Sequence, residues 1–347
     1  MAVSYTANAV FAKARAMYGK RLRKSQYTDM LSCRTIGELV SYLKTRTEYA
    51  SAFENRTDIS SNQVEELLRI HLLKKLEILC RYEISAGENV YKYFIAKNDI
   101  AQILKFIRLL ILGVPEKYLS ALPAFFSRYT ELDLYRIAKA RSFSELLEAL
   151  DGTPYKKLLE PYAENFGDNG IYLIMESSLN AYLYQYLSIL VDKGTDKKSA
   201  SQVHEVINYK ADMETIANIY RLTRLQDADN NIIKNYINTD FTNFTDKELD
   251  MLINEQYARD ILRLLPSTYY GKDFAKVEFS YLEGALQQMA YNKFVKGIRY
   301  YTSPTAVMFC YVFLAENEVQ NIIRIVEGIH YHIPPEKINA FLIGTDN

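Results

Sequence analysis

Glu65, Glu176 and Glu283 are the residues of this 347-residue chain whose type and spacing most invite a chemical interpretation. Each precedes a leucine by three residues, and carboxyl groups could in principle supply acid–base catalysis. One active site, however, does not need the same group in three copies. We interpret the glutamates as structural, each on an otherwise apolar helix face and paired with an arginine such as Arg108 or Arg221.

The other chemistry-bearing residues form no catalytic or metal-binding pattern. His330 and His332 could give two metal ligands, but no cysteine or HExxH-type partner accompanies them. The sequence has no GxxxxGK(S/T) or GxGxxG loop to cradle phosphates and no GxSxG nucleophile elbow. We therefore predict no cofactor, no metal site and no enzymatic activity.

The composition is that of an ordinary globular protein, with 49% hydrophobic and 24% charged residues. Lys+Arg and Asp+Glu number 42 each, which argues against a general nucleic-acid binder because such proteins need excess cations. The three cysteines are scattered and odd in number, which is typical of a reducing cytoplasm. The longest apolar run, Ala306 to Ala315, is too short to span a bilayer, so we predict no transmembrane segment.

The elements that must position the charged residues are predicted to be helices. Only 13 Gly and 8 Pro punctuate the chain, and long stretches carry apolar residues at i, i+3, i+4 and i+7. Asp99 stands at the head of such a stripe, so we expect it, or Asn98 before it, to cap the first turn of a helix. The same role is expected for Asp212 and Glu318. The sequence thus predicts an all-α protein.

Asp99, Asp212 and Glu318 also mark an internal repeat. Asp212 follows Asp99 by 113 residues, and Glu318 follows Asp212 by 106 residues. Apolar stripes continue from all three acids at matching offsets. The three glutamates named above precede these acids by 34, 36 and 35 residues.

Two further markers follow the same order. Arg108 and Arg221 stand nine residues after their acids, whereas the third copy has Glu327 at that offset and Arg324 one turn earlier. A period near 110 residues is the size of a small domain, so we predict an N-terminal helix over 1–30 and helical repeats over 31–130, 131–245 and 246–347. The last marker is a leucine-containing segment that ends in a tyrosine and occurs once in each repeat. The three tyrosines are Tyr49, Tyr155 and Tyr270.

The N-terminal segment Tyr5–Met17 and the three repeats together resemble the central-stalk subunit of V-type ATPases, known as the C subunit in bacteria and archaea and as the d subunit in eukaryotes. The family opens with Tyr-x-Ala-Asn-Ala and spaced basic residues. Its Asp-headed, Ile-rich helix resembles Asp99–Arg108 and Asp212–Arg221, and its C-terminal segment resembles Ala315–Gly328. The matching N-terminal residues are Tyr5, Ala7, Asn8, Ala9, Lys13 and Arg15.

The resemblance implies a funnel of three helical domains seated on the membrane rotor ring of c-type (K) subunits, with the shaft subunits D and F plugged into its open top. It implies a non-catalytic subunit, peripheral on the cytoplasmic face of the membrane, that couples ATP hydrolysis or synthesis to proton or sodium transport. Three similar domains suit a part on a rotation axis, because contiguous repeats can curl round a central opening. The alternative is a generic helical scaffold that binds other proteins without a rotor role.

Overall fold

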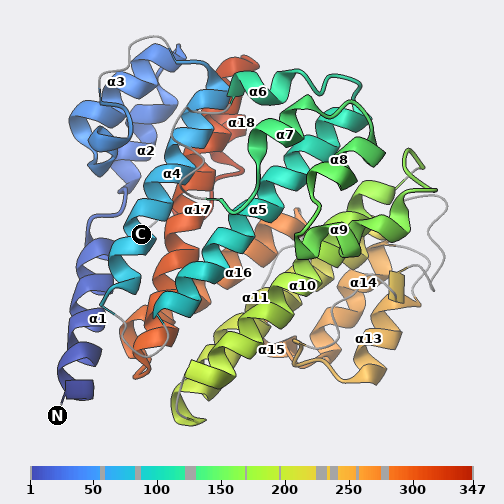
Figure 1. Ribbon diagram of the computed structural model, residues 1–347. Coiled ribbons are helices and arrows are strands. Elements are labelled where there is room, and N and C mark those ends of the chain that lie inside the picture. The colour runs from blue at the N-terminus through green and yellow to red at the C-terminus, as the bar shows by residue number, and fades with distance from the viewer. Residues whose placement is uncertain are drawn as a thin grey trace.

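Helices make up every regular element of the described chain (Figure 1). The prediction of an all-α protein is therefore confirmed. The computed structural model describes residues 2–54, 59–82, 87–121, 130–168, 170–194, 197–223, 233–234, 241–254, 258–274 and 281–345.

Six long helices form the frame of the molecule. Each contacts the next in chain order, and the last, α17, contacts the first, α4, so that the six close into a ring. α17 also contacts α1 and α11, and its first half is buried on all sides, which explains the unbroken apolar run there. The six are α4 (Ser61–Cys80), α5 (Gly87–Ile111), α10 (Ile171–Gly194), α11 (Lys197–Leu222), α16 (Leu282–Tyr300) and α17 (Pro304–His330).

The N-terminal part of the chain begins with the helices α1 and α2. α1 (Ala2–Gly19) packs on α17 and α4, and α2 (Lys24–Leu31) follows after Arg23, whose backbone is extended. The segment 1–30, expected to be one N-terminal helix, thus holds α1 and most of α2 with a break between them. The side chains of residues 2–8 lie outside the described set, so the contacts of Tyr5, Ala7 and Asn8 are not part of the description.

Short helices lie before, between and after the long ones. Several begin with a Ser or Thr whose hydroxyl accepts from an amide three residues later, as Thr35, Ser142 and Thr245 do. They are α3 (Ile36–Arg46), η1 (Glu48–Ala52), α6 (Lys117–Ala121), α7 (Leu134–Lys139), α8 (Phe143–Ala149), α9 (Pro154–Leu159), η3 (Glu160–Tyr162), α13 (Asp246–Ile253), α14 (Ala258–Leu264), η4 (Leu265–Ser267), α15 (Gly271–Phe274) and α18 (Pro335–Asn339).

The apolar core is divided into three clusters, and one of them joins the two ends of the chain. Residues from Leu22 to Leu68 pack there with residues from Val319 to Leu342. The order of short helices followed by two long ones recurs three times along the chain. The division into repeats at 31–130, 131–245 and 246–347 stays a prediction.

Crossing a bilayer requires a helix of about 20 predominantly apolar residues. Within the described ranges, no helix is both long enough and apolar enough to cross a membrane.

Candidate functional site: a central charged cavity

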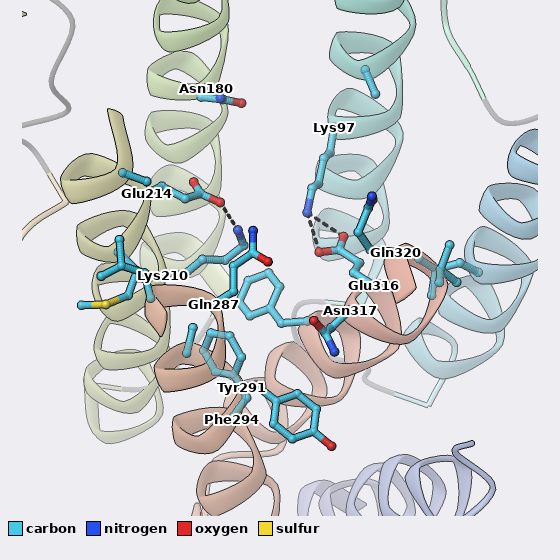
Figure 2. Close-up of a pocket in the computed structure, with 18 of the residues that line it drawn as sticks. Lys97, Asn180, Lys210, Glu214, Gln287, Tyr291, Phe294, Glu316, Asn317 and Gln320 are labelled. Carbon is cyan, nitrogen blue, oxygen red and sulfur yellow. Dashed lines mark hydrogen bonds and ion pairs between the residues drawn. The ribbon is translucent and has the colours of Figure 1, made fainter. Parts of the chain in front are cut away.

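The ring of long helices surrounds a cavity of about 470 Å³ (Figure 2). All six long helices contribute side chains to its wall. Phe94, Phe294 and Phe313 give the wall an apolar part, and charged side chains from facing helices give it a polar part. The cavity therefore combines apolar contact area with fixed charges, as binding sites do.

An ion pair crosses the cavity wall between α5 and α17. Lys97 Nζ lies 2.6 Å from Glu316 Oε1 and 2.7 Å from Oε2, and Figure 2 shows the two side chains pointing toward each other. Burial lowers the pKa of Lys97, and the Glu316 carboxylate opposes that effect. The ammonium groups of Lys97 and Lys210 lie 5.7 Å and 5.3 Å from the centre of the Phe313 ring.

A second ion pair lies on α11. Lys210 Nζ bonds Glu214 one turn away, and the hydroxyl of Tyr184 on α10 donates to the same carboxylate. Burial alone would raise the pKa of Glu214, but Lys210 and Tyr184 outweigh it and lower the pKa. Both residues of the pair are therefore charged at neutral pH.

The three glutamates first considered for acid–base chemistry lie near the start of α4, α10 and α16. Glu65 pairs with Arg69 on its own helix at 2.8 Å, and Glu283 lies 3.6 Å from Arg221 Nε on α11. Burial raises the pKa of Glu176, opposed by the nearby guanidinium of Arg221. Each glutamate has an arginine close by, and Glu176 and Glu283 line the cavity.

Arg108 and Arg324 also make hydrogen bonds between long helices, and the charge of Arg108 opposes the rise in the pKa of Glu176. Arg108 donates to the hydroxyl of Tyr172 on α10 at 2.9 Å. Arg324 lines the cavity and donates to Gln287 at 2.7 Å and to the carbonyl oxygen of Phe341 at 3.0 Å. These bonds tie α5 to α10 and α17 to α16.

Asp99, Asp212 and Glu318 do not cap helices, contrary to the expectation from the sequence. The helices that carry them begin at Gly87, Lys197 and Pro304, so each acid lies about three to four turns inside a helix. The reason is that no Pro or Gly interrupts the residues before each acid, which continue the helix.

All three acids are buried and bind the same kinds of donor. Asp212 accepts from the Tyr270 hydroxyl at 2.5 Å and from the Asn243 amide at 3.0 Å. Asp99 accepts from the Tyr155 hydroxyl at 3.5 Å and from the Glu131 amide at 3.4 Å. Thr242 and Thr130 add a hydroxyl donor to Asp212 and to Asp99.

The third acid binds donors from the opposite end of the chain. Glu318 accepts from the Tyr49 hydroxyl at 2.7 Å and from the Leu22 amide at 2.6 Å. Tyr49, Tyr155 and Tyr270 are the tyrosines that close the leucine-containing segments, so two sequence markers meet in space. We name these three clusters the acid–tyrosine sites. Each joins a long helix to short helices by hydrogen bonds, and the site at Glu318 joins the N-terminal helices to α17.

His330 and His332, the two histidines weighed as metal ligands, lie at and just beyond the C-terminal end of α17. His330 stacks edge-on against Tyr331, and His332 has a positive φ of 54° at the end of α17. The described part of the chain contains no group of three His, Cys, Asp or Glu side chains able to hold a metal ion.

The sequence interpretation missed Lys97, Lys210 and Glu316 in the cavity. A signal for them existed, because each stands two residues before one of the repeated acids. Aligning the repeats at that offset places all three on corresponding helix faces.

Comparison with known proteins identifies the kind of molecule that carries this ring. The C subunit of the A-type ATP synthase of Thermococcus kodakarensis is 22% identical over 339 residues, 95% of this chain and 88% of the relative. That of Methanocaldococcus jannaschii is 23% identical over 344 residues, 96% and 85% of the two chains. That of Methanosphaera stadtmanae is 24% identical over 263 residues, which cover 75% of this chain and 65% of the relative.

The fold defines an all-helical protein whose six long helices surround a cavity with charged lining. A profile of the ATP synthase (C/AC39) subunit family matches residues 10–341, nearly the whole chain. The chain belongs to this family. It is accordingly a non-catalytic subunit of a rotary ATPase.

Proposed function

We propose that this chain is the central-stalk rotor subunit that joins the shaft of a V/A-type ATPase to the membrane c-ring. In that position it couples ATP hydrolysis or synthesis to proton or sodium transport. The observation that carries the proposal is the closed ring of six long helices around a central cavity, in a member of the ATP synthase (C/AC39) subunit family.

We propose that the shaft of subunits D and F contacts the ring of long helices at this cavity. Torque can pass from a rod to a surrounding ring only if the walls do not yield. Buried apolar side chains on every long helix and the α17–α4 contact give such stiffness, because close-packed interiors resist compression.

We propose that the c-ring of K subunits is contacted by the end of the molecule where the first helix of each long pair ends and the second begins. Figure 1 shows the α4–α5, α10–α11 and α16–α17 ends on one side of the molecule. Large apolar side chains are exposed near these ends, with Tyr300 77% exposed, Ile189 51% and Ile78 43%. We propose that these side chains pack against the c-ring in that contact. The subunit would then be peripheral on the cytoplasmic face of the membrane.

Membership of the ATP synthase (C/AC39) subunit family favours this role over the generic helical scaffold. A scaffold without a rotor role would bind its partners whether or not the membrane ring was present.

The test is to assemble the complex in vesicles with and without this chain. We expect the preparation without it to keep soluble ATPase activity, to lose ATP-driven ion pumping, and to leave the ATP-hydrolysing head in the supernatant when the vesicles are sedimented. Ion pumping that survives removal of the chain would refute the rotor role.

A further inference from the structure

A second, much smaller cavity lies where the two ends of the chain meet α17. Its volume is about 20 Å³. Side chains of α1, α2, η1, α4, α16 and α17 contribute to its wall, and Ile343 and Gly344 near the C-terminus complete it. Glu318 and Leu22, which bond each other in the third acid–tyrosine site, are both part of this wall. The small cavity therefore adjoins that site.

The Tyr311 hydroxyl on α17 is a polar atom of this wall that lacks a hydrogen-bond partner within the described ranges. Tyr311 is only 2% exposed, so bulk water does not reach it. Burial raises the pKa of this hydroxyl, and the nearby carboxylates of Glu48 and Glu318 raise it further. The hydroxyl therefore keeps its proton at neutral pH. A buried donor of this kind costs free energy unless an acceptor meets it.

The rest of the wall carries charged groups that can still donate or accept. Lys75 Nζ bonds Glu48, and an ammonium group has three N–H donors. Each Glu318 oxygen accepts one bond, from the Tyr49 hydroxyl or the Leu22 amide, and can accept a second. Burial raises the pKa of Glu318, while Lys75 lowers it and Glu48 raises it, so these three charged groups lie near one another.

The size of the cavity and the chemistry of its wall together select a ligand. A buried water needs roughly 10–15 Å³ and two to four polar partners, so a cavity of 20 Å³ admits a water and no organic molecule. The Lys75 ammonium group in the wall disfavours a cation. Water fits because it both accepts and donates, as a mixture of hydroxyl, ammonium and carboxylate groups requires.

We propose that this cavity binds an ordered water molecule that links Tyr311 on α17 to the carboxylates of Glu48 and Glu318. The water accepts from the Tyr311 hydroxyl and donates to the carboxylate oxygens. It thereby extends the acid–tyrosine site at Glu318 to η1, and through the Lys75–Glu48 ion pair to α4. The proposal does not depend on a rotor role, because residues of this chain alone form the cavity.

A crystal structure of the unaltered chain at about 1.5 Å resolution tests the site directly. We expect a density peak about 2.6–3.2 Å from the Tyr311 hydroxyl oxygen and from a carboxylate oxygen of Glu48 or Glu318. The absence of a peak, or a Tyr311 hydroxyl bonded directly to a carboxylate, would overturn the proposal. A peak with several oxygen contacts near about 2.4 Å would identify a metal ion and would also overturn it.

Tyr311→Phe gives an independent test through the sign of its effect on stability. If a water satisfies the hydroxyl, its removal should lower the melting temperature by about 1–2 °C, because a hydrogen bond is lost. If the hydroxyl were unpaired, its removal would leave the melting temperature unchanged or raise it, and that result would refute the water site.

Two further variants calibrate this measurement. Tyr49→Phe removes a hydroxyl that bonds Glu318 directly at 2.7 Å, so it should lower the melting temperature at the same acid–tyrosine site. Tyr300→Phe is the matched control at a side chain that is 77% exposed, and it should change nothing. The crystal structure distinguishes a bridging water from a direct bond, since both would make Tyr311→Phe destabilising.

Discussion

Asp99, Asp212 and Glu318 show how a buried carboxyl group can join distant segments of a fold. Each is almost fully removed from solvent, and each accepts hydrogen bonds from a tyrosine hydroxyl and a backbone amide. A buried charge is costly unless such donors surround it. The donors come from segments distant in sequence, so satisfying the acid requires the segments to meet.

At the Asp212 site, Tyr270→Phe removes a hydroxyl that bonds the buried acid at 2.5 Å and also accepts from the Asn243 amide group at 2.6 Å. We expect a loss of about 1–3 kcal/mol in the free energy of unfolding, because both partners are left with an unmade bond. Urea unfolding monitored by circular dichroism measures it.

Tyr155→Phe is the matched comparison, since the Tyr155 hydroxyl lies 3.5 Å from Asp99. Because this hydrogen bond is longer, we expect Tyr155→Phe to lower the free energy of unfolding less than Tyr270→Phe does. An equal or larger loss for Tyr155→Phe would contradict the ranking by bond length.

Asp99 should make stability depend on pH. Burial raises its pKa from 3.8 to about 7 in the folded protein, against hydrogen bonds from Thr130 and the Glu131 amide that lower it. Between those two pH values the folded state holds a proton that the unfolded state has lost. Stability contributed by this group is therefore present below the lower value and is lost as pH rises to about 7.

The measurement is the free energy of unfolding from pH 4.5 to 7.5 in the unaltered chain and in Asp99→Asn. Subtracting the two removes other titrating groups, such as His71, whose pKa burial lowers to about 4. The difference should decline as pH rises. A flat difference would show that Asp99 does not titrate in this range.

At the scale of elements, the contact between α16 and α17 depends on a residue without a side chain. A Cβ at Gly297 would lie 2.5 Å from the sulfur of Cys310 and 2.6 Å from the Tyr301 ring. Both neighbours are held in place, since Cys310 is fully buried and Tyr301 partly so. The helices approach this closely only because position 297 is glycine.

Gly297→Ala should therefore separate the two helices and destabilise the protein by about 1–3 kcal/mol, the usual range for overpacking. Gly19→Ala is its control, because a Cβ at the end of α1 would have nothing within 4 Å. Thermal unfolding of both variants gives the comparison. A melting temperature lowered equally in both would mean that the α16–α17 contact is not the cause.

The joint between the N-terminal helices and α17 differs from the other two acid–tyrosine sites. At Asp99 and Asp212 the donors lie roughly 30 to 60 residues further along the same chain, as Glu131 and Tyr270 do. At Glu318 they come from Leu22 and Tyr49, so only non-covalent contacts close the ring there.

Glu318→Ala should loosen this joint before the others. We expect faster amide hydrogen exchange at Leu22 and through α2, because the amide loses its carboxylate acceptor. The equivalent change Asp212→Ala should speed exchange at Asn243 without affecting Leu22. Equal protection of Leu22 in the Glu318 variant and the unaltered chain would argue against the joint.

At the scale of the whole molecule, the ring leaves space at its centre that small side chains keep open. Ala101 on α5 lines this cavity. Ala101→Trp would fill part of its 470 Å³ without replacing a core residue. We expect shaft binding to weaken at least tenfold with little change in melting temperature, as measured by calorimetry and thermal unfolding. Full binding by this variant would place the partner elsewhere.

Helix content and the repeated acids could be predicted from the sequence, because periodicity and spacing are local or directly countable. The stripe after Asp99 indicates a helix whatever its neighbours are. The N-terminal limit of that helix could not be predicted, because an acid inside a helix and an acid at its start look alike when no Pro or Gly separates them. The capping role was wrong for this reason.

The partners of the acids were decided only by the tertiary structure. Tyr49 and Glu318 are 269 residues apart, and nothing in either local segment indicates that they meet. The pairing of Lys97 on α5 with Glu316 on α17 likewise cannot be read from either local segment, because the two residues are brought together only by the folded ring. Local patterns in the sequence specify which faces of the helices are apolar. The closure of six helices into a ring depends instead on how those faces pack against one another. That packing creates both the buried acid–tyrosine sites and the cavity.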